Sequence, residues 1–512
     1  MKKLSILSAL ILSIPLAIFS QGVDEAYLLA KENSFGTARS MGMGGAFGAL
    51  GGDMSAIQIN PAGVAVYRAS EATFTPSYQW DKATSKYYNT SADDSRDRFT
   101  ISQLGFVGVN APMREGATGI ISTNYAFNFQ RLNDFNTTTQ ISGINVGSSK
   151  LDQFRSEADG RYIKDLDPYG SGLAYATYLL DTLPNYSNNP MYHHVAEQYD
   201  ANTGNYYSRV NQWNSIQKSG SISEVGGSAG ININNKIYLG GSINIDFLKY
   251  NADSYYTEYD SDGSIPNLIS YDYNTFIHTN GVGLNLKAGI IYKPINALRL
   301  GISIQSPTWY TMTDNYNYEI SSYVENIGLD KDNNPITGAD ISKGGYYDYN
   351  YTSPYKLCSS IAVILGEKVA ISLDYKFIDY SFSSYHATTK NYNEKNQMDT
   401  LNMNIKEIYK ATNNFNVGIE FKPIPSIALR GGFIYNESGY KNDSNNTLSY
   451  TGGIGYRVQN YFIDFAYRLQ QVKSTYYPYS LDQSLVNNGY TNEPALITHN
   501  TSLAVLTVGV KF

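Results

Sequence analysis

Apolar and polar residues alternate along most of the chain after residue 70. The run VAISLDYKF at residues 369–377 is typical, because nearly every second position carries a Val, Ile, Leu, Tyr or Phe. Successive side chains of a β-strand point to opposite faces, so this pattern gives each strand one apolar face. A helix would scatter the same apolar residues around its whole circumference. The chain is therefore predicted to be all-β.

Fourteen segments show this alternation. They lie near residues 71–80, 99–111, 117–130, 223–235, 236–250, 281–294, 297–307, 355–365, 368–382, 412–423, 426–437, 447–458, 460–473 and 500–512. A strand of about ten residues, rising about 3.3 Å each and tilted by about 40°, crosses roughly 25 Å. That is the height of the apolar band of a membrane barrel, so each segment is long enough to span a bilayer.

Short and long connections alternate between these segments. The short ones lie around residues 112–116, 234–236, 293–296, 366–368, 422–426 and 458–460. The long ones are residues 81–98, 131–222, 251–280, 308–354, 383–411, 438–446 and 474–499. This asymmetry is typical of outer-membrane barrels, whose long loops all lie at the extracellular end. We therefore predict a 14-stranded antiparallel transmembrane β-barrel over residues 71–512. A secreted β-sandwich is the alternative, but it would not need two unequal sets of loops.

The two ends of the chain carry export and assembly features. Lys2 and Lys3 precede the apolar run 4–19, and Ser20 is small, which predicts a signal peptide over residues 1–20 cut before Gln21. A membrane anchor is the alternative, although the run is short and contains Pro15. The last strand ends in Phe512, a feature expected to be read by the machinery that assembles outer-membrane barrels.

Composition removes several other classes of protein. The chain has 512 residues, of which only 16% are charged, and its formal net charge is −7. A sequence-independent nucleic-acid binder needs a basic face, so nucleic acid is not an expected partner. The single cysteine, Cys358, excludes a disulfide framework and a cysteine-based zinc site.

Residues 21–70 do not alternate and are rich in small side chains. Asp53 is placed to cap a short helix through Ala56 and Ile57, and the Asn60–Pro61 step is placed to end it. The glycines at 42, 44, 45 and 48 are not preceded by a strand, which excludes a phosphate-binding loop. A compact segment of this kind fits inside a barrel, so residues 21–70 are predicted to form a hatch that closes the lumen.

The run MGMGGAFGALGGDMSAIQINPAG within this segment resembles the FadL/TodX family of outer-membrane transporters for long-chain fatty acids and other hydrophobic compounds. Its NPAG core, Asn60 to Gly63, is the most distinctive part. The resemblance implies a fourteen-stranded barrel in the outer membrane of a Gram-negative bacterium, with passive uptake of hydrophobic molecules. It also implies a hatch shift and a sideways exit into the membrane lipid. The hatch residues it indicates are Gly44, Gly45, Asp53, Asn60, Pro61, Ala62 and Gly63. The loop at 131–222 is unusually long and rich in Tyr, so the ligand need not be a fatty acid.

If the apolar rows face lipid, the opposite rows face the lumen. These rows include Lys287, Arg299, Asp374, Lys376, Glu420, Lys422, Arg430, Arg457, Asp464 and Arg468. One hypothesis is that these charges pair with one another and hold the hatch. The other is that a basic side chain binds the carboxylate of an amphipathic ligand, for which Arg is well shaped. The candidates for this role are Arg299 and Arg430, followed by Lys287 and Arg457.

The long loop at 131–222 contains three candidate helices, near residues 151–159, 172–183 and 191–199. Leu173, Tyr175, Tyr178 and Leu179 are candidates for an apolar surface that captures the ligand outside the cell. Such a surface is needed because a water-filled pore disfavours apolar molecules.

No enzymatic, metal or cofactor site is predicted. His193, His194 and Glu197 lack a second cluster of ligands, and Pro335 stands where a calcium loop beginning at Asp330 needs Gly. All five His residues fall in predicted external loops, away from any candidate nucleophile. The alternative function is a non-transport member of the same barrel family, acting in protein secretion or as a surface binding module, including for haem.

Overall fold

The computed structural model describes residues 22–31, 33, 35–110, 119–184, 189–200, 205–443, 445–482, 485–486, 490 and 493–512. The predicted signal peptide and the predicted turn at 112–116 lie outside these residues. Among the helices that the structure describes, none combines the length and apolar character needed to cross a bilayer.

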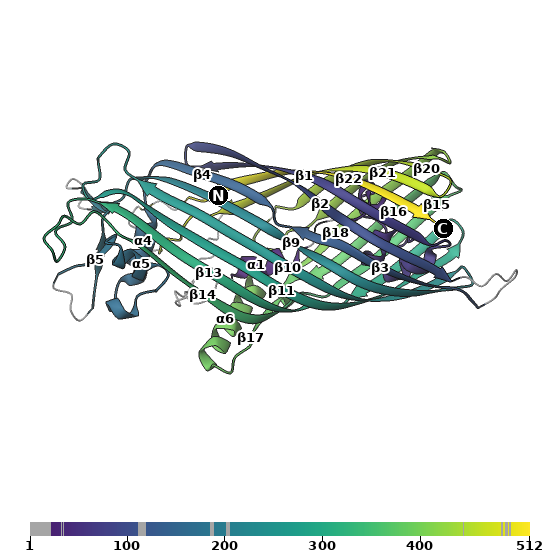
Figure 1. The fold of residues 1–512 in the computed structure, drawn as a ribbon, viewed down its shortest axis with the longest axis horizontal. Coiled ribbons are helices and arrows are strands. Elements are labelled where there is room, and N and C mark those ends of the chain that lie inside the picture. Colours follow the sequence, from purple (N-terminus) through teal and green to yellow (C-terminus); the bar gives the residue numbers. More distant parts are fainter. Residues whose placement is uncertain are drawn as a thin grey trace, which may run out of the picture.

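A single closed sheet of eighteen antiparallel segments forms the wall (Figure 1). The segments are β1 (Glu71–Tyr87), β2 (Thr90–Asn110), β3 (Ile120–Asp134), β4 (Thr137–Val146), β9 (Val210–Ile233), β10 (Ile237–Tyr259), β11 (Leu268–Ile295), β12 (Leu298–Gln305), β13 (Trp309–Val324), β14 (Asp340–Thr352), β15 (Lys356–Leu365), β16 (Val369–Asp379), β17 (Ser384–Ala387), β18 (Ala411–Ile424), β19 (Ile427–Asn436), β20 (Thr447–Val458), β21 (Tyr461–Tyr476) and β22 (Ala495–Lys511). Four wall strands are each interrupted once, so β3–β4, β12–β13, β14–β15 and β16–β17 each count as one strand. The wall therefore has fourteen strands, as predicted.

The first and last strands close the barrel. β1 pairs with β22 from Glu71↔Lys511 up to Lys86↔Leu496, in antiparallel register. Phe512 follows β22, donates its backbone N–H to Ser70 O at 3.0 Å and stacks on Phe106. Closure leaves no free sheet edge, which is what a sheet needs to survive in a lipid environment.

Along the strands the exposed side chains are apolar and many of the buried ones are polar, the reverse of the pattern in a soluble protein. On β11 the side chains of Val282, Leu284, Leu286, Ile290 and Tyr292 are exposed, whereas those of Asn285 and Lys287 are buried. Above Val282 the exposed positions become polar, with Asn280 and His278. The apolar band from Val282 to Tyr292 is roughly 25 Å high at about 3.3 Å per residue and the usual tilt. The predicted orientation of the lumen-facing rows is thus confirmed.

All fourteen predicted segments overlap a wall strand, but the predicted long loops were too long. β1 continues to Tyr87 and β2 begins at Thr90, so most of the predicted loop 81–98 is strand. β10 and β11 likewise fill most of the predicted loop 251–280. Above the apolar band neither face of a strand meets lipid, so the apolar alternation that identified the strands is lost there.

Three parts of the chain contain helices or short strands that do not belong to the main sequence of wall strands. The N-terminal segment contains α1 (Val23–Ala30), α2 (Ala38–Gly42), α3 (Met54–Ile59) and the 3₁₀ helix η1 (Pro61–Val66). The loop between β4 and β9 contains α4 (Lys150–Ala158), η2 (Ile163–Asp165), α5 (Ser171–Ala176), β5 (Leu180–Thr182), β6 (Tyr192–His194), β7 (Gln198–Asp200) and β8 (Asn205–Tyr207). A turn of 3₁₀ helix, η3 (Tyr380–Phe382), precedes β17, and α6 (Tyr392–Ile408) joins β17 to β18.

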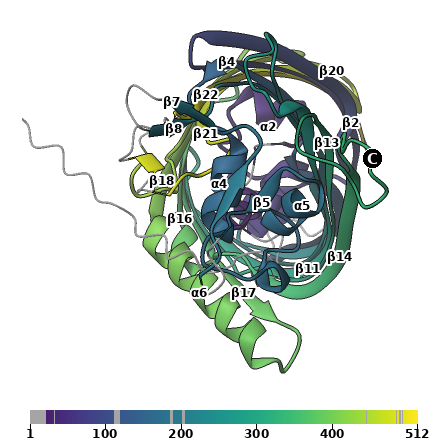
Figure 2. The same cartoon turned by 90° about the vertical axis from the view of Figure 1, so that its left-hand side faces the viewer.

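Two of the three helices predicted in the long loop are present, as α4 and α5. The third prediction, near 191–199, is wrong, because these residues form β6 and β7. β6 pairs with β5 through Leu180↔His194, so pairing with a neighbouring segment prevails over local helical preference there. Figure 2 looks along the barrel from the end that carries α4 and α5. α2 lies inside the ring of strands, and α6 lies against its outer side.

Candidate functional site

The N-terminal segment lies in the lumen and is bound to the wall by hydrogen bonds from several sides. Ala38 N donates to Thr507 Oγ1 of β22 at 2.7 Å, and Gly48 N donates to Asp374 Oδ2 of β16 at 2.9 Å. On the opposite wall, Asn124 Nδ2 of β3 donates to Val64 O at 2.8 Å. We call residues 35–67 of this segment the lumen segment. Its contacts on opposing strands mean that it spans the lumen of the barrel.

The sequence-predicted hatch residues are all buried or nearly so within the lumen segment. Asp53 caps α3 by accepting a hydrogen bond from Ser55 N at 2.9 Å, and it also accepts one from Thr37 Oγ1 at 2.7 Å. Gly44 and Gly45 have φ values of 62° and 70°, which favour glycine. α3 ends before Asn60, as predicted from the Asn60–Pro61 step.

The NPAG core, Asn60 to Gly63, forms a compact turn against the wall. Asn60 Oδ1 accepts a hydrogen bond from Ala62 N at 3.1 Å and so caps η1, whose first residue is Pro61. Asn60 Nδ2 donates to Gly48 O at 2.8 Å and to Ile290 O of β11 at 3.3 Å. One side chain thus joins two parts of the lumen segment to the barrel wall, which explains why an amide is needed there.

The four basic residues proposed as ligand contacts are placed by internal interactions. Lys287 Nζ lies 2.8 Å from both carboxylate oxygens of Glu224, and both side chains are buried. Arg299 donates to the backbone carbonyl of Leu50 in the lumen segment. Arg457 lies over the ring of Phe462 at 5.5 Å.

Arg430, the fourth of these basic residues, lies in a buried charge network. This network is at the end of the barrel with the short turns, which we call the lower end. Its Nε lies 2.7 Å from Glu420 Oε2, and its Nη1 lies 2.6 Å from Asp464 Oδ1. Arg39 of α2 contacts the same Glu420. In this conformation these contacts support the hypothesis that the lumen charges hold the hatch.

A cavity lies beside the lumen segment, against the inner faces of β16, β18 and β19. Its lining includes Phe35, Leu132, Ile378, Asn414 and Asn416, and it reaches Ile59, next to Asn60. The volume of this cavity is about 750 Å³, open solvent included.

Two lysines that the sequence analysis did not select as ligand contacts, Lys31 and Lys376, line this cavity. Lys31 Nζ lies 5.8 Å from the ring centre of Tyr27. Within the described part of the chain, neither lysine forms an ion pair. Lys376 was recognised only as a lumen-facing charge, and Lys31 lies outside the alternating strands. Only the folded structure brings both lysines to the lining of one cavity.

Above the cavity the lumen is apolar and lined by tyrosines. This tyrosine layer contains Ala26, Leu29 and Ala30 of α1, Met398, Leu401 and Ile405 of α6, Tyr409 just after α6, and the wall residues Leu248, Tyr250, Tyr310, Met312, Tyr349, Tyr351, Ile378 and Tyr385. Hydroxyl groups fix α1 within it: Tyr351 donates to Ala26 O at 2.8 Å, and Tyr409 donates to Val23 O at 2.7 Å. α1 thus lies within the tyrosine layer, next to α6.

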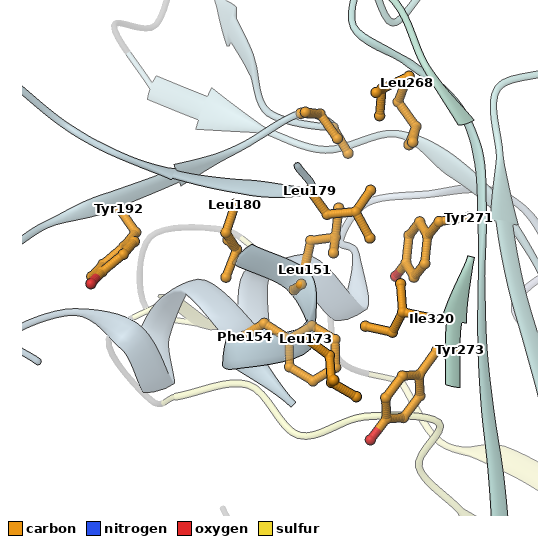
Figure 3. Close-up of a cluster of buried hydrophobic side chains, with 14 of the residues drawn as sticks. Leu151, Phe154, Leu173, Leu179, Leu180, Tyr192, Leu268, Tyr271, Tyr273 and Ile320 are labelled. Atoms are coloured by element: carbon orange, nitrogen blue, oxygen red, sulfur yellow. The ribbon is translucent and has the colours of Figure 1, made fainter. Parts of the chain in front are cut away.

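A second apolar cluster closes the mouth of the barrel (Figure 3). Leu151 and Phe154 of α4 and Leu173 of α5 pack against Tyr271, Tyr273 and Ile320 of the wall. We call this the mouth cluster. Of the four predicted capture residues, Leu173 and Leu179 are buried in it, Tyr175 is partly buried, and Tyr178 is exposed. The expected outward apolar surface therefore faces inward in this conformation.

The first turn of α4 is fixed by a buried carboxylate of the wall. Glu258 of β10 accepts hydrogen bonds from Lys150 N at 2.8 Å, from Gln212 Nε2 at 2.9 Å and from the Ser149 hydroxyl. A negative charge at a helix N-terminus is favourable, so Glu258 stabilises the closed mouth. His194 lies 2.9 Å from Asp152 of α4, and both side chains are fully buried. Within the described residues no group of three or more His, Cys, Asp or Glu side chains could hold a metal ion.

Comparison with known proteins gives likeness in structure alone. No family model matches the chain, and no curated protein matches it in sequence. A crystal structure of a Pseudomonas aeruginosa FadL homologue matches with a TM-score of 0.56 and 14% identity, covering 94% of this chain and 99% of that one. The Pseudomonas putida toluene transporter TodX matches with a TM-score of 0.51 and 12% identity, covering 94% of this chain and all of that one (100%). The chain therefore has the closed fourteen-stranded barrel fold of the FadL homologue and TodX.

Proposed function

We propose that this protein is an outer-membrane channel for passive uptake of small hydrophobic molecules, long-chain fatty acids and aromatic hydrocarbons being the first candidates. The exposed apolar band on the wall is the height of a bilayer's apolar core, which supports insertion into a membrane. The fold it shares with a toluene transporter supports the class of cargo.

The change of lumen chemistry along the barrel is the observation that carries this proposal. Along β10 the buried side chains are polar near the lower end, with Ser242, Asn244 and Asp246, and become apolar higher up, with Leu248 and Tyr250. The mouth cluster continues this apolar lining upward through Tyr256. An apolar molecule is stabilised in the upper lumen and destabilised at the charged lower end, because burying apolar surface is favourable and displacing water from charges is costly.

Interruptions in three wall strands support a sideways exit for such a molecule. β12–β13, β14–β15 and β16–β17 are interrupted at residues 306–308, 353–355 and 380–383. β17 pairs with β14, whereas β18 pairs with β16 and β19, and α6 lies between β17 and β18 in the chain. We propose that this seam, covered by α6 and blocked from inside by α1, is the exit into the membrane.

Lys31 and Lys376 are proposed to receive the head group of an amphipathic ligand. Both lysines line one cavity together with the apolar Phe35 and Leu132. Among the described residues of this lining the one acidic residue, Glu437, is already paired with Lys410 at 2.8 Å. This lining suits a carboxylate with an alkyl chain. This proposal replaces Arg299 and Arg430 as first choices, since the contacts of those residues are to the hatch and the wall.

Uptake in a strain without its own hydrophobic channels tests the function. Cells that produce the protein are expected to accumulate radiolabelled oleate and toluene several-fold faster than cells with an empty vector. Lys31→Met combined with Lys376→Met is expected to slow oleate uptake and to leave toluene uptake unchanged, because toluene has no charge. Lys390→Met, at an exposed position, is the control. Equal accumulation with and without the protein would refute the transport proposal.

The seam has its own test. Leu401→Ala combined with Ile405→Ala removes buried side chains of α6 and is expected to raise the uptake rate of both compounds. Met403→Ala on the exposed face of the same helix is the matched control. Mass spectrometry of the purified protein is expected to identify a bound lipophile. A bound lipophile without any uptake would instead favour the surface binding module.

A further inference from the structure

Several wall strands carry a glycine where the lumen segment comes closest to them. Gly230 of β9, Gly240 of β10 and Gly289 of β11 form a row, because Gly240 is the direct cross-strand partner of both others. On the other side of the barrel Gly418 of β18 is the partner of Gly432 of β19. Glycine is unfavourable within a strand, so two such rows need a reason.

The first row lies directly beneath the NPAG core. A methyl group added at Gly240 would lie within 3.0 Å of the backbone of Pro61 and Ala62, and one at Gly289 within 3.0 Å of the Asn60 side chain. One at Gly230 would meet the Val64 and Ala65 side chains. Real Cβ atoms essentially never come that close to backbone atoms. The NPAG turn can therefore reach this depth only because the wall has no side chains there.

The second row receives the glycine turn of the lumen segment in the same way. A methyl group at Gly418 would lie within 3.0 Å of Met43 O, and one at Gly432 within 3.0 Å of Gly44 N. Gly44 N also donates to Thr451 Oγ1 of β20, the direct partner of Gly432, at 3.1 Å. Both close contacts involve backbone atoms, which cannot move aside as a flexible side chain can.

We infer that these two glycine rows, Gly230–Gly240–Gly289 and Gly418–Gly432, are positioning residues that set the resting depth of the lumen segment and thereby seal the barrel against water and polar solutes. The inference concerns the seal and does not depend on which ligand the protein carries. Overpacking at either row displaces the lumen segment, while the wall strands themselves have the backbone conformation that alanine accepts.

Gly241 and Gly431 provide matched controls. Each is adjacent in sequence to a glycine of one row, and because side chains alternate along a strand, its own side-chain position is on the outer face of the wall. A methyl group at Gly241, next to Gly240, would have its nearest neighbour at 3.6 Å, on Lys287 O. At Gly431, next to Gly432, the nearest neighbour would be Ile419 Cγ2 at 3.7 Å. These are ordinary contacts, so Gly241→Ala and Gly431→Ala change the strand but not the contact with the lumen segment.

The test compares Gly240→Ala and Gly432→Ala with Gly241→Ala and Gly431→Ala in reconstituted full-length protein. Liposome swelling in arabinose and single-channel conductance in planar bilayers measure the leak of polar solutes. The shift of migration on heating in gel electrophoresis shows that the barrel is folded. We expect the inner variants to leak about tenfold more than wild type, with faster hydrogen exchange over residues 38–66. The outer variants are expected to match wild type.

Three results would overturn the inference. The first is an inner variant that folds and leaks no more than wild type. The second is equal leakage from an inner variant and its outer control, which would assign the effect to the strand. Because the two rows lie on opposite walls, one row still tests the inference if a variant of the other fails to fold. Failure of both inner variants to fold would assign the glycines to barrel folding and would also overturn it. Loss of oleate uptake is not a criterion, so this test is independent of the proposed function.

Discussion

Arg39 of the lumen segment and Glu420 of the wall form a two-contact ion pair, with Arg39 Nε 3.0 Å from Glu420 Oε2 and Arg39 Nη2 3.1 Å from Glu420 Oε1. The same carboxylate binds Arg430, which in turn binds Asp464. Glu420, on β18, therefore connects the lumen segment to β19 and, through Arg430, to β21. A buried carboxylate shared by two guanidinium groups compensates charges that would otherwise be costly to bury.

Removing Arg39 is expected to loosen α2 without unfolding the wall, because Glu420 keeps Arg430 as a partner. In Arg39→Ala, hydrogen exchange of the α2 backbone amides is expected to be about tenfold faster, which corresponds to roughly 1.4 kcal/mol. Arg39→Lys is expected to lie between Arg39→Ala and wild type, since Lys cannot make both contacts. Arg68→Ala, at an exposed residue just beyond the segment, is the control. Unchanged exchange in Arg39→Ala would show that the ion pair does not hold α2.

Asn60 is expected to be sensitive to replacement in two separable ways. Asn60→Ala loses both the cap of η1 and the bonds to Gly48 and Ile290, at a cost of about 1–2 kcal/mol in the docking of the lumen segment. Asn60→Asp keeps the capping oxygen, but its second carboxylate oxygen would face the carbonyls of Gly48 and Ile290, so an effect at least as large as that of Asn60→Ala is expected. Protease cleavage of the lumen segment in the folded barrel measures both. Cleavage of Asn60→Asp that is slower than that of Asn60→Ala would instead assign the role of Asn60 to its cap of η1.

The tyrosine hydroxyls that fix α1 are expected to restrain the exit route. Tyr351→Phe and Tyr409→Phe each remove one hydrogen bond to the backbone of α1 and leave the ring packing in place. Each is expected to cost about 1 kcal/mol and to raise the uptake rate of a hydrophobic compound. Tyr346→Phe, at an exposed position on β14, should behave as wild type. If both tyrosine variants transport more slowly, α1 is part of the ligand path and not an obstacle in it.

The closed mouth is expected to respond to alkaline pH through Lys150. Its ammonium group lies 4.9 Å from the ring centre of Tyr273 and 5.2 Å from that of Tyr256. Burial lowers the pKa of Lys150 to about 8 from its ordinary 10.5. The undocked helix therefore binds more protons between these values, so docking of α4 strengthens as pH rises from about 8 to 10.5 and is unaffected by this group below pH 8.

Hydrogen exchange of α4, corrected for the intrinsic pH dependence of exchange, measures this linkage. The protection of α4 is expected to increase by about 1–3 kcal/mol between pH 8 and pH 10. Lys150→Met keeps an unbranched side chain against the rings and is expected to remove the pH dependence. A pH profile that is the same in Lys150→Met and wild type would exclude Lys150 as its source.

The sequence was sufficient for the part of the barrel that faces lipid, because a bilayer demands an apolar residue at every second position. Leu284 and Leu286 on β11 could be recognised from the sequence as lipid-facing residues for that reason. The strand extensions above the band were missed, since outward positions such as Asn280 and His278 meet no apolar surroundings. α6 was missed because only Met398, Leu401 and Ile405 are buried in a helix otherwise rich in polar residues.

The site was harder to predict than the wall. Local signals identified the capping role of Asp53 and the end of α3 at Asn60, because both depend on neighbouring residues. Lys287 was correctly placed in the lumen, but its partner Glu224 lies two strands away, on β9. Such pairs depend on the stagger of the strands, which the pattern along one strand does not contain. The wall glycines carry no signal in their own strands, because the reason for them is the segment packed against them.

The height of the wall has a consequence for the path of a molecule entering from outside. β11 continues from Gly281 up to Leu268, beyond its apolar band, which is roughly 30 Å at about 3.3 Å per residue and the usual tilt. If the proposed channel sits in a membrane at its apolar band, this part of the tube projects well beyond the bilayer. A hydrophobic compound entering at the far end would then be enclosed by protein, and kept out of bulk water, until it reaches the depth of the bilayer.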